Sequence, residues 1–163
     1  MQIDYLADQM EAAELLAGWH HAEWRESTLE ETAAELRSHT GRRQIPTTFV
    51  ALDHGRVMGS ASLLVADLVG WEHLSPWLAS VFVAPDFRGK GVGRALVSRA
   101  VDDAQQLGIR KLYLYTAGAS DYYAQFGWLK FEHAAHPRAT PIVIMHRSLA
   151  ACSADSTVRH EMT

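Results

Sequence analysis

The first quarter of the chain combines one short strand pattern with two helical ones. Residues 3–7 read as a strand, and the segment after them repeats apolar residues at helical spacing, at Met10, Leu15, Leu16 and Trp19. A second helix is predicted to run to Gly41. Its start is marked by the pair Ser27–Thr28, followed three residues on by the pair Glu30–Glu31, which is the pattern of a capping box. We therefore expect the order strand, helix, helix.

The middle of the chain has the pattern of strands joined by a tight turn. Residues 47–52 and 56–66 are two apolar runs separated by Asp53-His54-Gly55, which predicts an antiparallel hairpin. A third run, residues 76–84, reads as a further strand that leads directly into a glycine-rich segment.

The longest helix is predicted from residue 92 to residue 107, because apolar residues form one stripe at three- and four-residue spacing and Gly108 occupies the C-terminal cap position. Residues 120–126 indicate a short helix, and three more strands are expected at 110–116, 128–132 and 141–149. The predicted order β-α-α-β-β-β-α-β-α-β-β indicates a mixed α/β (α+β) fold with one central mixed sheet of six to seven strands. We expect one domain over residues 1–150 and a loose tail over 151–163.

Composition changes this picture little, but it removes several classes of partner. The 15 Lys and Arg against 19 Asp and Glu give no overall attraction to nucleic acid or to an anionic membrane, so any anion site must be local. A single cysteine, Cys152, excludes an internal disulfide, and the first residues lack the pattern of a signal peptide. No apolar run reaches the roughly 20 residues of a membrane-spanning helix. We expect a cytoplasmic protein.

A local anion site is predicted where the third apolar run meets the longest helix. The first amides of a helix have no partner within the helix and carry partial positive charge, and glycines leave those amides accessible. Here Gly89, Gly91 and Gly93 alternate with Arg88, Lys90 and Arg94. The pattern favours a diphosphate ligand.

Two common phosphate motifs do not fit this segment. A Walker A loop needs a hydroxyl residue after its lysine, but Lys90 is followed by Gly91. In a dinucleotide fingerprint, a third glycine follows the second glycine by three residues. That position holds Arg94 when counted from Gly91 and Leu96 when counted from Gly93. The glycines alone would fit equally well a helix entry flanked by solvated basic side chains.

Two motifs together resemble the GNAT family of acyl-CoA-dependent N-acetyltransferases. The family motif [QR]-x-x-G-x-[GA] after a strand is matched at Arg88, Gly91 and Gly93. A second family motif, F-Y-x-x-x-G-[FW], is matched by YYAQFGW, with Tyr123 at its tyrosine and Gly127 at its glycine. The resemblance covers residues 45–149.

The resemblance implies acetyl-CoA as co-substrate, no metal, and a sheet that splays between its fourth and fifth strands. The backbone of the fourth strand would hold the pantetheine arm, and the glycine-rich segment would hold the diphosphate. The implied cofactor residues are Val81, Phe82, Val83, Arg88, Gly89, Lys90, Gly91, Val92, Gly93 and Arg94. Tyr123 would be the general acid that protonates the leaving thiolate, because a phenol is protonated at neutral pH.

The acceptor side is less defined by the sequence. Glu72 is a candidate general base, with His73 and Asp67 as alternatives, and each carboxylate could equally be a solvated loop charge. Trp24, Trp77 and Asp67 are candidate contacts for a cationic amine. His20 and His21 do not predict a metal site, because adjacent helical residues point apart.

Two functions follow from these residues. The first is N-acetyl transfer to a primary amine of a small molecule or a polypeptide, and the second is a non-catalytic acyl-CoA sensor. We expect no nucleic acid or membrane partner, and a monomer or a homodimer.

Overall fold

The strands of the described residues form one sheet in the computed structural model, which describes residues 1–138 and 140–151. Its order is β1-β2-β3-β4-β5-β7-β6, and every neighbouring pair is antiparallel except β4 and β5. The strands are β1 (Gln2–Tyr5), β2 (Thr47–Asp53), β3 (Arg56–Leu64), β4 (Trp77–Val83), β5 (Lys111–Thr116), β6 (Leu129–Ala135) and β7 (Pro141–Ser148). Cys152 and the rest of the expected tail, up to residue 163, lie outside the described residues.

The α-helices follow the predicted order. They are α1 (Ala13–Trp24), α2 (Leu29–Ser38), α3 (Val92–Gln106) and α4 (Ser120–Ala124), with short 3₁₀ turns at Leu6–Asp8, Met10–Ala12 and Pro85–Phe87. The first helix therefore begins later than its apolar pattern indicated, because the stretch around Met10 forms a 3₁₀ turn. The capping box at the start of α2 is formed between Thr28 and Glu31, as predicted.

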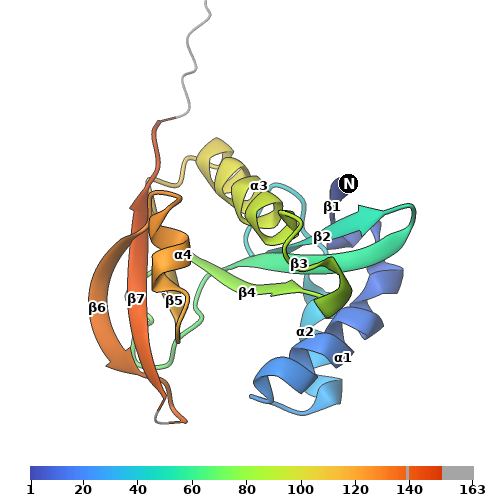
Figure 1. Ribbon diagram of the computed structural model, residues 1–163, viewed down its shortest axis with the longest axis horizontal. Helices are drawn as coiled ribbons and strands as arrows, with labels where there is room; N and C mark the ends of the chain where they lie inside the picture. The colour runs from blue at the N-terminus through green and yellow to red at the C-terminus, as the bar shows by residue number, and fades with distance from the viewer. Residues whose placement is uncertain (139, 152–163) are drawn as a thin grey trace, which may run out of the picture.

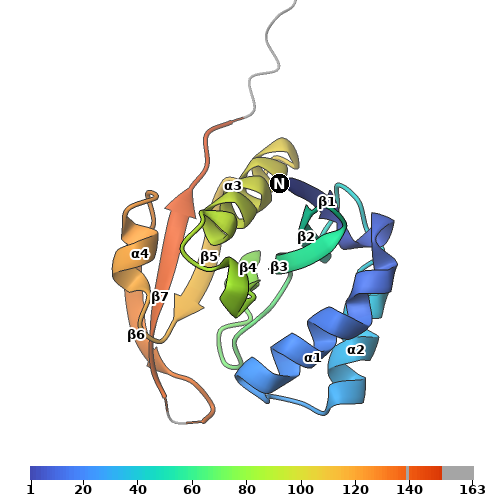
Figure 2. The same cartoon turned by 45° about the vertical axis from the view of Figure 1, so that its right-hand side comes forward.

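The helices cover both faces of the first half of the sheet (Figure 2). Side chains alternate between the two faces of a strand, and β2 shows this clearly. Phe49 and Ala51 pack in the cluster that contains the apolar face of α3. Val50 and Leu52 pack on the other side, with residues of α1 and α2. The helices therefore bury apolar side chains on both faces of this half of the sheet.

The sheet opens between its two parallel strands. Trp77 and Tyr113 are the one residue pair that joins β4 to β5 within the described chain, and beyond them the two strands diverge (Figure 1). A bulge in β4 accompanies the divergence: the pairing with β3 shifts between Ser60 and Ser62, and Ser80 has a left-handed φ of 52°. The predicted mixed sheet, with a splay between the fourth and fifth strands, is confirmed.

Candidate active site

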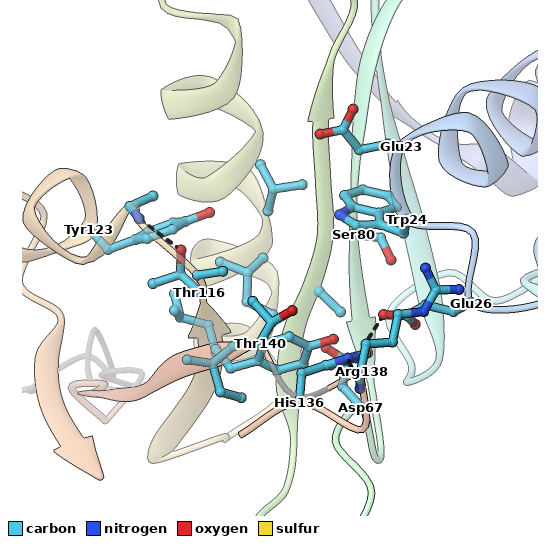
Figure 3. A pocket seen from close by; sticks show the side chains of 18 residues that line it. Glu23, Trp24, Glu26, Asp67, Ser80, Thr116, Tyr123, His136, Arg138 and Thr140 are labelled. Atoms are coloured by element: carbon cyan, nitrogen blue, oxygen red, sulfur yellow. Dashed lines mark hydrogen bonds and ion pairs between the residues drawn. The ribbon is translucent and has the colours of Figure 1, made fainter. Parts of the chain in front are cut away.

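A cavity of about 520 Å³ occupies the opening between β4 and β5. One wall is the stretch Leu78–Val81 of β4, and the opposite wall comes from the end of β5 and from α4. The α1–α2 connection and the β6–β7 loop complete it (Figure 3). Since a strand rises about 3.3 Å per residue, the β4 wall alone is about 10 Å long. A cavity of this size accepts a small organic ligand.

Tyr123 lines this cavity from α4. Its ring packs edge-on against the ring of the buried Trp128, with 6.2 Å between centroids, and its hydroxyl points towards β4 (Figure 3). Burial raises the pKa of Tyr123 to about 12, and the neighbouring Tyr122 adds a smaller contribution in the same direction. The phenol therefore keeps its proton at neutral pH, as a proton donor must.

Carboxylates gather on the far side of the cavity from Tyr123. Asp67, Glu23 and Glu26 all line it, and Asp67 and Glu26 lie together near the β6–β7 loop (Figure 3). The pKa of Asp67 is raised to about 8, first by burial and then by the charges of Glu26 and Glu35. A carboxyl group with this pKa changes its charge near neutral pH, which is the range in which a group can both accept and release a proton.

One contact between an imidazole and a carboxylate crosses the carboxylate side of the cavity. His136 Nε2 of the β6–β7 loop lies 2.9 Å from Glu26 Oε1 of the α1–α2 connection. The imidazole also packs on Tyr115 of β5, with 5.9 Å between ring centroids. Residues from three distant parts of the chain therefore meet at this edge of the cavity.

The glycine-rich segment ends in amides that have no hydrogen-bond partner within α3. The first hydrogen bond of α3 runs from Ala95 N–H to Gly91 C=O, so the amides of Val92, Gly93 and Arg94 have no partner within the helix. Gly91 adopts a left-handed φ of 79° at the N-cap, and it offers no side chain that would occupy these amides. This geometry leaves an anion site open at the start of α3.

The basic side chains around this anion site rest on aromatic rings. Arg88 lies over Phe82, at 5.7 Å from the ring centroid, and its Nε donates to the carbonyl of Val83 at 2.9 Å. Arg94 lies over Phe126 at 5.2 Å. Lys90 lies over Phe87 at 5.9 Å, and Arg56 lies over the same ring at 5.1 Å. Arg56, Arg88, Lys90 and Arg94 together place several positive charges near the N-terminus of α3.

The sequence-predicted cofactor residues differ in whether their side chains or only their backbone atoms are accessible to a ligand. Arg88, Gly89, Lys90, Gly91 and Arg94 are solvent-exposed beside the open amides. The side chain of Phe82 is instead buried against Trp19, Trp24 and His20 of α1, so only its backbone is available on the β4–β5 side.

Three predicted residues of the acceptor side lie elsewhere. Trp77 is fully buried in the core with its Nε1 donating to Leu74 C=O, so it does not contact an acceptor. Glu72 does not line the cavity: it is exposed and accepts from the Gly70 amide at 3.0 Å, which holds its pKa below the usual value. His73, the third candidate base, stacks on Trp71 outside the cavity. Asp67 and Trp24 do line the cavity.

Sequence reasoning missed Glu26 and His136, which stand in segments without a motif and meet only through the fold. It also missed the left-handed Ser80, because no residue type around it marks a bulge. His20 and His21 diverge as expected, since His20 bonds to Ser60 Oγ and His21 to the Ser27 carbonyl. Within residues 1–138 and 140–151, no three His, Cys, Asp or Glu side chains are grouped so that they could hold a metal ion. None of the helices described there is long and apolar enough to cross a membrane.

Comparison with solved structures shows the same fold in known enzymes. An aminoglycoside 6'-N-acetyltransferase complexed with coenzyme A matches 93% of this chain and 99% of its own, with a TM-score of 0.75 and 14% identity. A mutant spermidine N-acetyltransferase from Vibrio cholerae matches 91% of this chain and 95% of its own, with a TM-score of 0.66 and 19% identity. At these identities the likeness shows the fold alone.

Sequence comparison shows the family. An uncharacterized N-acetyltransferase from Methanocaldococcus jannaschii is 31% identical over 91 residues, which are 53% of this chain and only 36% of that relative. Residues 10–128, well over half of the chain, match the sequence model of the Acetyltransferase (GNAT) family. The resemblance carried by the two motifs is therefore confirmed, and this chain belongs to the Acetyltransferase (GNAT) family.

Proposed function

We propose that this protein transfers the acetyl group of acetyl-CoA to a primary amine. The observation that carries the proposal is the cavity between β4 and β5, which has a protonated phenol on one wall, carboxylates on the far side and the open amides of α3 nearby. These three features match the three needs of the reaction: an acid for the leaving thiolate, an anionic environment for a cationic amine, and a site for a diphosphate. Family membership supports the same reaction.

The diphosphate of the co-substrate would bind at the start of α3. The amides of Val92, Gly93 and Arg94 supply donors, and the side chains of Lys90 and Arg94 supply positive charge. The pantetheine arm would lie along β4, where the strand has lost its pairing with β5 and its backbone is free on that side. Acetyl-CoA bound in this way delivers its thioester into the cavity.

The chemistry then needs an attack and two proton transfers. The amine nitrogen attacks the thioester carbon, and collapse of the tetrahedral intermediate breaks the carbon–sulfur bond. Tyr123 donates its proton to the leaving sulfur. The ionised form of Asp67 is the proposed acceptor of the ammonium proton, directly or through water, because Asp67 alone of the three candidate bases lines the cavity.

The acceptor is proposed to be a small cationic amine. Glu23 and Glu26 place two carboxylates on the acceptor side, Asp67 adds a third in its ionised form, and Arg138 is the guanidinium that lines the cavity beside them. Trp24 also lines the cavity, and its indole ring can bind an ammonium group through a cation–π interaction. The volume of the cavity suits a small molecule or the end of a polypeptide chain.

A thiol-release assay over a panel of amines, run beside a calorimetric titration with CoA, tests this proposal. We expect CoA binding and turnover of at least one cationic amine. The double variant Arg88→Glu, Arg94→Glu should abolish CoA binding while preserving the fold, because both side chains are exposed. CoA binding without turnover of any amine would favour the non-catalytic sensor, and absence of CoA binding by the wild-type protein would refute both functions.

A further inference from the structure

The residue before the proposed general acid departs from the family motif. The motif reads F-Y-x-x-x-G-[FW], but Tyr122 stands at the position of its phenylalanine. Relative to the motif, the chain therefore gains one hydroxyl group at this position. The ring itself keeps the packing that a phenylalanine would make, edge-on to Phe126 and to Tyr123 with 5.1 and 5.2 Å between centroids.

The structure directs this hydroxyl away from the cavity and towards the start of α3. A Cβ atom built on Gly93 would lie 3.5 Å from Tyr122 Oη and 3.5 Å from the Val83 side chain. The hydroxyl is therefore close to the junction of β4 and α3, beside one of the open amides. Arg94 lies on the same side, because its guanidinium stacks on Phe126, the ring that Tyr122 contacts.

The hydroxyl is free to bind a ligand. Tyr122 is 39% exposed, and Oη makes no hydrogen bond to any of the protein groups in the described part of the chain. Burial raises the pKa of Tyr122, and the opposing effect of Arg94 is smaller, so the hydroxyl keeps its proton and acts as a donor. A protonated donor beside helix amides and a guanidinium completes a set of groups that all favour an anion.

We propose that the Tyr122 hydroxyl donates a hydrogen bond to the diphosphate of CoA, as an additional cofactor contact beside the amides of α3. This inference rests on the proposed function, since it adds a contact to the same co-substrate site. Tyr122 and Tyr123 then divide two tasks between adjacent positions: Tyr122 holds the diphosphate outside the cavity, and Tyr123 protonates the thiolate within it.

Calorimetry with CoA on the wild-type protein and on Tyr122→Phe tests the contact, because the substitution removes only the hydroxyl and restores the residue of the family motif. A hydrogen bond to a charged group is worth about a tenfold change in affinity, so we expect the Kd of CoA to rise about tenfold. Tyr113→Phe is the matched control, since Tyr113 packs on Trp77 and does not line the cavity. Its Kd for CoA should equal that of the wild-type protein.

A second titration identifies the part of CoA that the hydroxyl contacts. ADP carries a diphosphate and no pantetheine, and its affinity, measured by competition with CoA, should fall by the same factor in Tyr122→Phe. Equal CoA affinity of the wild-type protein and Tyr122→Phe would overturn the inference and leave the proposed function standing. A loss confined to CoA, with ADP unaffected, would also overturn it. Absence of CoA binding by the wild-type protein would overturn the proposed function as well.

Discussion

Replacement of Asp67 by asparagine should change how the stability of the protein depends on pH. The pKa of Asp67 is raised from 3.8 to about 8 in the folded protein, by burial first and then by the charges of Glu26 and Glu35. Between these two values the folded state binds a proton that the unfolded state releases. Stability therefore falls as pH rises from 3.8 towards 8, and it levels off above that range.

The size of the effect follows from the shift. One pKa unit corresponds to about 1.36 kcal/mol, so the wild-type protein should lose about 2–4 kcal/mol more than Asp67→Asn between pH 5 and pH 8. The lower part of this range allows for the partial exposure of the side chain. At pH 8, where the wild-type protein suffers most of this cost, the variant should be the more stable of the two.

Urea unfolding at pH 5, 6, 7 and 8, followed by tryptophan fluorescence, measures the difference. Asp102→Asn is the matched control, because Asp102 is an exposed carboxylate on α3 and its removal leaves the cavity unchanged. Subtraction of the wild-type curve from that of Asp67→Asn isolates the contribution of this one group. Parallel curves for the two proteins over this pH range would show that the folded state does not shift the pKa of Asp67, and the reasoning would be refuted.

Three further substitutions test the site and the elements that position it. Tyr123→Phe should lower kcat for thiol release by about 10²–10³-fold, since it removes the proposed general acid; a kcat within threefold of the wild-type value would exclude that role. Gly91→Ala forces a side chain into a left-handed φ of 79° and should cost about 1–2 kcal/mol in urea unfolding, whereas unchanged stability would mean that the turn relaxes. Thr28→Ala breaks the capping box of α2 and should cost about 1 kcal/mol, and an unfolding midpoint equal to that of the wild-type protein would contradict the cap.

The sequence by itself determined the features that depend on neighbouring residues. The capping box at Thr28 and Glu31 joins groups three residues apart, so its residue pattern is sufficient to predict it. The open amides after Gly91 follow in the same way from a glycine turn and the start of a helix. The order of the strands and helices was also readable, because each element has its own apolar period.

Only the tertiary structure decided which polar residues form the acceptor side. Asp67 and Glu72 stand on one loop and carry the same chemical group, yet Asp67 lines the cavity near Glu26, and Glu72 bonds to an exposed turn. Likewise, His136 gains its carboxylate partner from a segment more than one hundred residues earlier. Burial and charge–charge interactions depend on the segments that pack together, and a local residue pattern carries no information about those distant neighbours.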